Sequence, residues 1–213
     1  MTPVALSPDH PDYPARLNAA PGLTRLPTLT VLGDRALLQA NALALLCSRE
    51  VPPRPPFTAE ALLPLLVTSK LPIISGFHAP LEKACLAGLM QSGHPTIQVL
   101  ARGLDGLRLT PAQTTAIAAG RLVIVSPFSA HQRRASVALA QRRNRVVTAI
   151  AIATLVPYAA PNSKASALVQ ALAENGSRIF TLEDSETATL HALGAIAATL
   201  QSLVQLSLTK PSH

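Results

Sequence analysis

The sequence predicts an α/β protein in which a doubly wound, mostly parallel sheet carries helices on both faces. Short apolar runs of strand length recur along the 213 residues, and segments with helical periodicity lie between them. Strands that read as unbroken apolar runs are typical of parallel sheets, because helices cover both faces of such sheets. Apolar residues make up 48% of the chain and charged residues 14%, which supplies enough side chains for a large buried core.

The elements alternate in a regular order. We expect strands at residues 42–47, 72–75, 96–100, 122–126, 153–159 and 178–182. We expect helices at residues 58–69, 80–92, 111–119, 134–151 and 163–175, and a last helix over 186–206. The domain organisation that we predict is an N-terminal extension at 1–30, a single domain at 31–207 and a frayed tail at 208–213.

The chain is strongly basic, and its charges are unevenly distributed. The formal net charge is +7, and 14 of the 18 basic residues are arginine, whose planar guanidinium suits phosphate. Between Gly106 and Ala173 there is no Asp or Glu, whereas eight Lys and Arg residues occur there. This imbalance predicts a surface that binds a polyanion such as nucleic acid.

Several classes of protein are disfavoured by what the sequence contains. No apolar stretch reaches the ~20 residues that span a membrane, and the N-terminus lacks a signal-peptide pattern, so we expect a cytoplasmic protein. Cys47 and Cys85 lie in apolar runs, which predicts free, buried thiols. The six histidines are scattered, so we expect no metal site. We also expect no cofactor, because neither G-x-G-x-x-G nor a Walker A loop is present.

The loops that follow the predicted strands form a candidate anion-binding rim. In a doubly wound sheet, ligands bind at the carboxyl ends of the strands, where the strand order reverses. Small residues, hydroxyls and cations stand at these positions, and Phe77 and Phe128 are the only aromatic residues that we expect there. The candidate phosphate-binding residues of these loops are Ser48, Arg49, Ser75, Gly76, His78, Arg102, Asn162, Ser163 and Lys164.

Catalytic groups are scarce on this rim. Ser75, His78 and Glu82 have the residue types of a hydrolase triad, but no G-x-S-x-G turn surrounds Ser75. We interpret Glu82 and Lys83 as the solvated face of a helix. The sequence therefore predicts a protein that is not an enzyme.

Lys164 has an unfavourable position unless an anion is bound. It falls in the first turn of the helix predicted at 163–175, with Asn162 or Ser163 as the expected N-cap. A positive charge there opposes the helix dipole. A phosphate at the same helix N-terminus would remove this conflict, and we therefore predict one.

Three arginines crowd around Asn144 at the edge of an apolar segment. Arg142, Arg143 and Arg145 have no acidic neighbour in the sequence, and desolvating a guanidinium is costly unless an anion pairs with it. We predict that Arg143, Asn144 and Arg145 belong to a site for a nucleic-acid backbone. At a helix start capped by Asn144, one of the two arginines would reach the rim, while the other braces a neighbouring loop or a packed partner. In the alternative interpretation, Arg145 lies along the sheet and binds loop carbonyls.

These motifs together resemble the DprA/Smf family of DNA-processing proteins over about residues 33–182. The family's Gly-Asp and Gly-Ser-Arg segment is similar to "GDRALLQANALALLCSRE". Its Ser-Gly block is similar to "IISGFHAPLEKACLAGL", its Arg-Asn-Arg block to "RRNRVVTAIA", and its serine loop to "VPYAAPNSKASALVQAL". We expect a divergent member, because Cys47, Pro80, Glu82 and Leu86 replace the Gly, Gly, Asp and His of these blocks. We also expect a short member, since the sequence shows neither a C-terminal winged-helix domain nor a full helical N-terminal domain.

The resemblance implies a Rossmann-like domain that binds single-stranded DNA in a basic pocket. It also implies a homodimer that loads a RecA-type recombinase on incoming DNA during natural transformation. Ser48 and Arg49 fall on the family's Ser-Arg motif, and Ser163 falls on its loop serine.

Two other functions stay open at this point. One is a sensor that binds a small nucleotide and acts through a partner. The other is a phosphoribohydrolase of the related LOG superfamily, whose P-G-G-x-G-T-x-x-E loop corresponds here to "PNSKASALV", without the glycines and the glutamate. The sequence does not decide whether the ligand is DNA or a small nucleotide.

Overall fold

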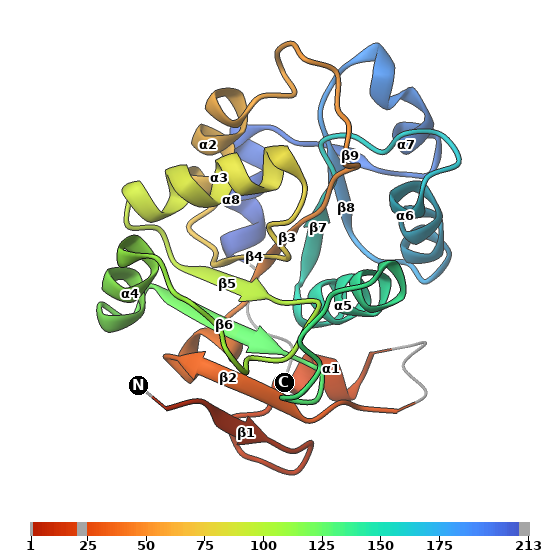
Figure 1. Cartoon of the computed structure of the whole chain (residues 1–213). Helices are drawn as coiled ribbons and strands as arrows, with labels where there is room; N and C mark the ends of the chain where they lie inside the picture. The colour runs from red at the N-terminus through yellow and green to blue at the C-terminus, as the bar shows by residue number, and fades with distance from the viewer. Residues whose placement is uncertain (1, 21–24, 209–213) are drawn as a thin grey trace.

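The computed structural model describes residues 2–20 and 25–208, and residues 209–213 of the expected tail lie outside this range. In the described part, one nine-stranded sheet has the order β1-β2-β6-β5-β4-β3-β7-β8-β9 (Figure 1). The strands from β3 to β9 are mutually parallel, which confirms the predicted α/β class. The strands are β1 (Val4–Leu6), β2 (Leu29–Gly33), β3 (Leu43–Leu45), β4 (Ile73–Ser75), β5 (Thr96–Val99), β6 (Leu122–Ser126), β7 (Ala153–Leu155), β8 (Ile179–Thr181) and β9 (Ile196–Ala197).

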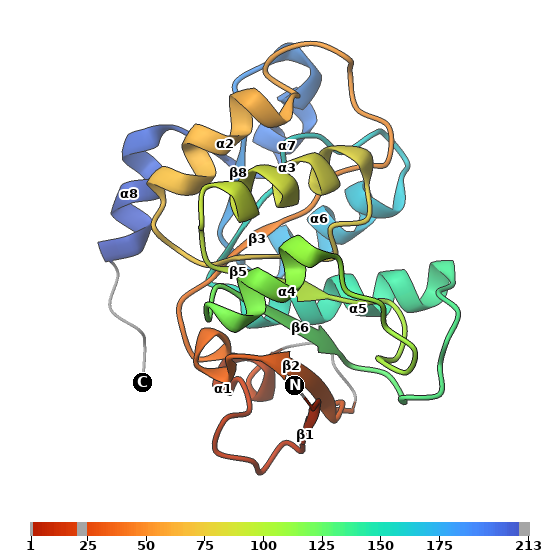
Figure 2. The ribbon, with the colours of Figure 1, turned by 60° about the vertical axis from the view of Figure 1, so that its left-hand side comes forward.

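Helices cover both faces of the sheet (Figures 1 and 2). One face carries α2 (Ala59–Thr68), α3 (Pro80–Gln91), α4 (Pro111–Ala118) and α8 (Leu200–Leu208). The other carries α1 (Ala15–Asn18), α5 (Val137–Ile150), α6 (Lys164–Glu174) and α7 (Ala188–Ala192). Alternate strand residues serve the two layers, so that Leu43 and Leu45 pack with α2 and α3, whereas Ala44 packs on the α5 side.

The N-terminal segment contributes two strands to the sheet. β1 pairs antiparallel with β2, and β2 pairs antiparallel with β6, with Val31 opposite Val125. Leu29 and Val31 are fully buried or nearly so, because α1 and α5 pack over them. β2 crosses the boundary that we expected between residues 30 and 31, and the division into extension and domain stays a prediction.

The prediction of one long helix over 186–206 is wrong. This segment contains the 3-10 helix η2 (Ser185–Thr187), α7, β9 and α8. Gly194 follows α7 with a φ of 88°, a left-handed conformation that ends the helix and that glycine adopts without strain. Thr199 then starts α8, because its Oγ1 accepts a hydrogen bond from the Ser202 N–H at 3.1 Å.

The strand order reverses between β3 and β7. From β3 the chain continues to β4, β5 and β6 on one side, and then crosses to β7, β8 and β9 on the other. Leu45 pairs with Leu155, so β3 and β7 end side by side. The residues that follow these two strands therefore share the crevice in which doubly wound sheets bind ligands.

Candidate nucleic-acid interface

Ser48 and Ser163 meet at this switch point, although 115 residues separate them. Their Oγ atoms are 3.3 Å apart. The Ser48 Oγ also accepts a hydrogen bond from the Ala160 N–H at 2.8 Å, and the Ser48 N–H donates to the Tyr158 carbonyl at 3.1 Å. These contacts join the loop after β3 to the loop after β7.

The N-terminus of α6 lies beside the serine pair. Ser163 is its N-cap, because the Ser163 Oγ accepts from the Ser166 N–H at 3.1 Å. Asn162, the other expected cap, is exposed and has a φ of 55°. Lys164 in the first turn and Arg49 beyond Ser48 are both exposed. The hydroxyls of Ser48 and Ser163, the side chains of Arg49 and Lys164, and the N-terminus of α6 thus belong to this part of the rim. Such a combination favours the binding of an anion.

Glu82 is a buried residue, and our interpretation of it as part of a solvated helix face is wrong. Its side chain is 5% exposed. Its Oε1 accepts from the Cys47 N–H at 3.1 Å, and its Oε2 accepts from the His78 and Ala79 N–H groups at 2.9 and 3.3 Å. Sequence reasoning missed this role, although Pro80 and Glu82 at the first and third positions of α3 are typical of a capped helix start.

Arg143 is buried behind the loop that follows β4. Only 4% of it is exposed, and its Nη1 donates to the Val99 carbonyl at the end of β5 at 3.2 Å. A Cβ atom on Gly76 would lie 1.0 Å from this Nη1, so the guanidinium takes the space of a side chain at that position. Among the described residues no acceptor reaches the Arg143 Nε. Burial lowers the pKa of Arg143, and the nearby negative charge of Glu82 opposes that shift.

The helix that carries the arginines starts earlier than Asn144. Ser136 caps α5, because its Oγ accepts from the Leu139 N–H at 3.2 Å. Asn144 lies in the middle of α5, so the prediction that it caps the helix is wrong. The helix starts earlier because the Ala, Leu, Gln and Arg residues before Asn144 are good helix formers. In a helix, residues two apart point in directions about 200° apart. Arg143 is accordingly buried, whereas Arg145 is exposed.

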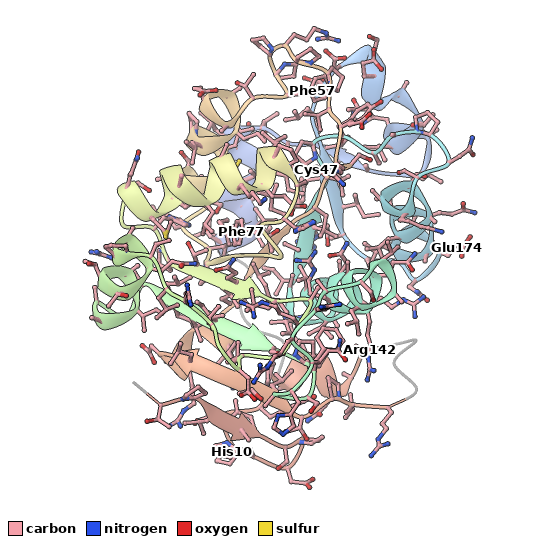
Figure 3. The ribbon with its side chains drawn as sticks, viewed as in Figure 1. His10, Cys47, Phe57, Phe77, Arg142 and Glu174 are labelled. Carbon is pink, nitrogen blue, oxygen red and sulfur yellow. The ribbon has the colours of Figure 1, made fainter. Side chains whose placement is uncertain are left out.

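Five arginines form what we call the α5 basic surface. They come from the loop after β5, the loop between β6 and α5, and α5 itself. Figure 2 shows these segments, and Figure 3 labels Arg142. The first two segments are joined, because the Gly103 N–H donates to the Gln132 carbonyl at 2.7 Å. One acidic residue of this region, Asp105, lies 3.1 Å from the His131 ring. The surface consists of Arg102, which is half-buried, and of Arg133, Arg134, Arg142 and Arg145, which are exposed.

The aromatic residues expected on the rim are largely covered. Phe77 and Phe128 are only 3% and 8% exposed. The Arg142 guanidinium lies 5.9 Å from the centre of the Phe128 ring, within the range of a cation–π contact. Tyr158, which sequence reasoning did not select, is half-buried at the switch point and packs edge-to-face on Phe57 with ring centres 5.7 Å apart. Tyr158 is therefore the more accessible aromatic ring of the crevice.

The predicted rim residues fall into three groups. Ser75 is fully buried, and its Oγ accepts from the Phe77 N–H at 3.1 Å, so it supports the turn before the exposed His78. The structure brings Ser48, Arg49, Asn162, Ser163 and Lys164 to the switch point, Ser75, Gly76, His78 and Arg143 to the ends of β4 and β5, and Arg102 and Arg145 to the α5 basic surface. Their contacts with a ligand stay predictions.

Other features of the described residues bear on the remaining expectations. No group of three or more His, Cys, Asp or Glu residues within residues 2–20 and 25–208 could hold a metal ion. Over the same ranges, no helix is long and apolar enough to cross a bilayer. Cys47 and Cys85 are free cysteines, the first half-buried and the second buried. Burial raises the pKa of both thiols, and that of Cys85 reaches about 12.

Comparison with models of known protein families identifies the family of this chain. A family model described as DNA recombination-mediator protein A matches residues 5–203. The chain belongs to this family. The resemblance to the DprA/Smf family in the sequence is thereby confirmed.

Two solved structures of the family share the fold. The X-ray structure of DNA processing protein A from Streptococcus pneumoniae has a TM-score of 0.78 at 20% identity, covering 96% of this chain and 74% of that chain. The second structure is that of DNA processing protein A from Helicobacter pylori, which describes how that protein binds single-stranded DNA. It has a TM-score of 0.76 at 18% identity. That match covers 96% of this chain and 95% of the other. A search of curated protein sequences found no match.

Proposed function

We propose that this protein of the DNA recombination-mediator protein A family binds single-stranded DNA without catalysing a reaction on it. The observation that carries the proposal is that the Ser48–Ser163 pair and the α5 basic surface lie at the same edge of the sheet. Both follow the carboxyl ends of parallel strands, β3 and β7 in one case and β5 and β6 in the other. The Helicobacter pylori relative, which is named for single-stranded DNA binding, supports the same ligand.

The span of this edge favours a chain of phosphates over a single nucleotide. Four strand spacings separate β7 from β6, through β3, β4 and β5. At about 4.8 Å per spacing, the loops after these strands lie roughly 19 Å apart. One mononucleotide does not reach from the N-terminus of α6 to the arginines beyond β6, whereas a DNA strand contacts both.

A binding role also agrees with the chemistry of the rim. The carboxylate of Glu82 lies beside the predicted site residue His78, and three backbone N–H groups already donate hydrogen bonds to it. A general base has to reach the proton that it removes, and this buried carboxylate is engaged by the backbone instead. The loop that corresponds to the phosphoribohydrolase motif lacks the glutamate of that motif, which disfavours this enzyme. The nucleotide sensor remains the second candidate function.

The family resemblance supports finer proposals. We infer a cytoplasmic homodimer that loads a RecA-type recombinase on single-stranded DNA during recombination and natural transformation. The basic surface would contact the DNA backbone, and the recombinase would then take over the bound strand.

Binding of labelled oligothymidylates of increasing length, at several salt concentrations, tests the proposal. We expect the affinity to rise with length and to fall with salt, by a log–log slope of about −0.7 for each phosphate contact. Arg142→Ala/Arg145→Ala should reduce the magnitude of this slope by about 1.4, which corresponds to two contacts. Arg121→Ala is the matched control, because this exposed arginine precedes β6 at the opposite edge of the sheet.

Two results would contradict the proposal. If a mononucleotide binds as tightly as a long oligonucleotide, the protein is a nucleotide sensor. If Arg121→Ala reduces the salt slope by half as much as the double variant does, each lost charge has the same effect wherever it lies, and the α5 basic surface is not the interface.

A further inference from the structure

The loop between β6 and α5 presents a serine in an unusual setting. Arg133, Arg134, Ala135, Ser136 and Val137 are consecutive, and all five are exposed. The backbone of Ser136 is extended, with φ −135° and ψ 168°. Val137 is 68% exposed, so the fold does not use this apolar side chain in its core. Figure 2 shows the loop projecting beyond the ends of β5 and β6.

This arrangement fits the substrate groove of a protein kinase. Kinases select substrates largely by the charge pattern around the acceptor hydroxyl. In an arginine-directed kinase, carboxylates of the enzyme pair with arginines three and two residues before the acceptor serine. A hydrophobic pocket then takes the apolar residue directly after the serine. We propose that Ser136 is a phosphorylation site for an arginine-directed serine/threonine kinase, and that its phosphate weakens nucleic-acid binding. The second half rests on the proposed function.

The reaction is an ordinary phosphoryl transfer from a nucleoside triphosphate. The Ser136 Oγ attacks the γ-phosphorus, and an O–P bond forms there. The bond from the γ-phosphorus to the bridging oxygen breaks, and the nucleoside diphosphate leaves. The hydroxyl proton passes to the catalytic carboxylate of the kinase.

The serine can reach a kinase without unfolding of the core. The Ser136 Oγ accepts one hydrogen bond, from the Leu139 N–H at 3.2 Å. Val137 and Ala138 in the first turn of α5 are exposed, and the first buried residue of the helix is Arg143. Helix ends open at little cost in free energy. The first turn can therefore straighten into a kinase groove while the packed part of α5 stays in place.

A phosphate on Ser136 would lie beside the arginines of the α5 basic surface and change the charge of that surface. A phosphoserine at an N-cap accepts hydrogen bonds from the first-turn N–H groups and is favoured by the helix dipole. It adds a charge of about −1.5 to −2. Arg133 and Arg134 are adjacent in the chain, so the phosphate competes with nucleic acid for their guanidinium groups. Binding should weaken although no contact residue is lost.

The modification is tested on the purified full chain with ATP and the catalytic subunit of a cyclic-AMP-dependent protein kinase, followed by mass spectrometry. We expect one phosphate, at Ser136. Ser136→Asn should abolish it while keeping an N-cap. Ser129→Ala is the matched control, because Ser129 is exposed in the same loop without arginines before it, and this variant should be phosphorylated normally. Arg133→Ala/Arg134→Ala should slow the reaction at least tenfold.

The consequence is tested by binding of oligothymidylate to the phosphorylated and untreated protein. We expect at least fivefold weaker binding after phosphorylation, and no change in kinase-treated Ser136→Asn. A protein that stays unmodified at Ser136, while a control peptide is phosphorylated, overturns the site. Complete phosphorylation with unchanged affinity overturns the regulation. Neither result touches the proposed function, which depends on binding by the unmodified protein.

Discussion

The guanidinium of Arg143 stands where a side chain at Gly76 would have to lie. Nη1 of Arg143 is 1.0 Å from the position of a Cβ on Gly76, and the same nitrogen donates to the Val99 carbonyl at 3.2 Å. A glycine at the end of β4 is thus required by an arginine that comes from α5. This contact ties the loop after β4, the end of β5 and α5 into one unit behind the rim.

Gly76→Ala should therefore destabilise the protein by about 1–3 kcal/mol, because the new methyl group displaces a buried guanidinium. Chemical denaturation of the variant measures this change. In the double variant Gly76→Ala/Arg143→Ala the methyl group meets no guanidinium, so the two effects should couple. Strict additivity of the two single changes in unfolding free energy would show that the contact does not restrict residue 76.

Glu82→Gln should also destabilise the fold. The carboxylate of Glu82 accepts from three backbone N–H groups and lies near the charge of Arg143. An amide replaces one of its oxygens by a donor, which leaves at least one buried N–H group unpaired, at about 1–3 kcal/mol. The neighbouring Lys83→Ala changes an exposed residue of the same helix and should stay within about 0.5 kcal/mol of wild type. Equal stability of the two variants would refute the structural role of Glu82.

The strands were predictable where burial on both faces leaves a clear pattern. β3 to β8 each lie inside a predicted apolar run, because every side chain of a central parallel strand is covered by a helix or loop. β1 and β9 are short edge strands with exposed residues such as Val4 and Ile196, so they carry no such pattern. The break in the last helix was marked by Gly194, a typical stop signal that the helical periodicity of the surrounding residues outweighed.

The site was predictable only as far as topology determines it. The meeting of Ser48 with Ser163 follows from the strand order, since the two residues lie in the loops that follow the neighbouring parallel strands β3 and β7. The burial of Arg143 depends on how α5 packs against β4, and no local sequence pattern encodes that three-dimensional contact. The role of Glu82 was readable from the start of α3, but its contact with Cys47 was not.

The two thiols should react slowly with a disulfide reagent in the native protein. Burial raises the pKa of Cys85 to about 12 and also raises that of Cys47, so little thiolate is present at pH 8. We expect both thiols to react rapidly once urea unfolds the chain, which gives the total of two. Fast labelling of Cys85 without denaturant would show that the helix that carries it opens in the native state.

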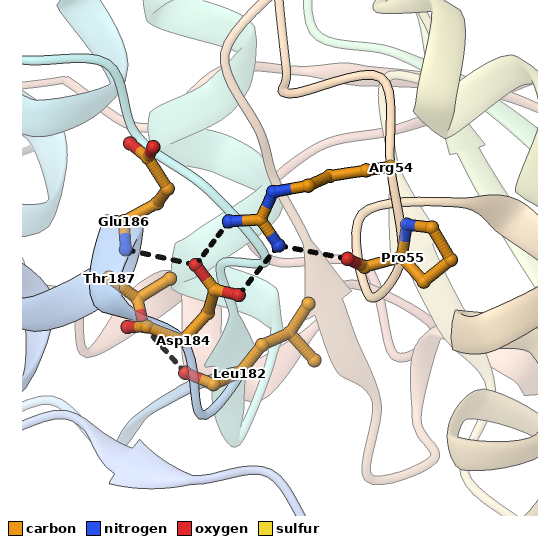
Figure 4. A network of polar contacts seen from close by, with 6 residues as sticks. All are labelled: Arg54, Pro55, Leu182, Asp184, Glu186 and Thr187. Carbon is orange, nitrogen blue, oxygen red and sulfur yellow. Dashed lines mark hydrogen bonds and ion pairs between the residues drawn. The ribbon is translucent and has the colours of Figure 1, made fainter.

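The ion pair between Arg54 and Asp184 should make the stability depend on pH in the acid range. Two hydrogen bonds of 2.9 Å join the guanidinium to the carboxylate, and Arg54 also donates to the Pro55 carbonyl (Figure 4). The pair connects the proline-rich loop after β3 to η2. The hydrogen bonds from Arg54, together with the smaller effect of the hydrogen bond from the Glu186 N–H, lower the pKa of Asp184 from 3.8 to about 2.

A carboxyl group whose pKa is lower in the folded state stabilises the fold above its unfolded pKa and loses that effect as the pH falls. The difference in unfolding free energy between wild type and Asp184→Asn should therefore be constant from pH 7 to about pH 5, shrink below about pH 4 and be largely lost as the pH falls through about 2. Because the Arg54 side chain is exposed and that of Asp184 is only partly buried, salt should reduce the difference at neutral pH. Urea titrations at these pH values measure it, with Asp9→Asn as an exposed control. A difference that persists unchanged at pH 2 would show that the contribution of Asp184 does not depend on the ionisation of its carboxyl group.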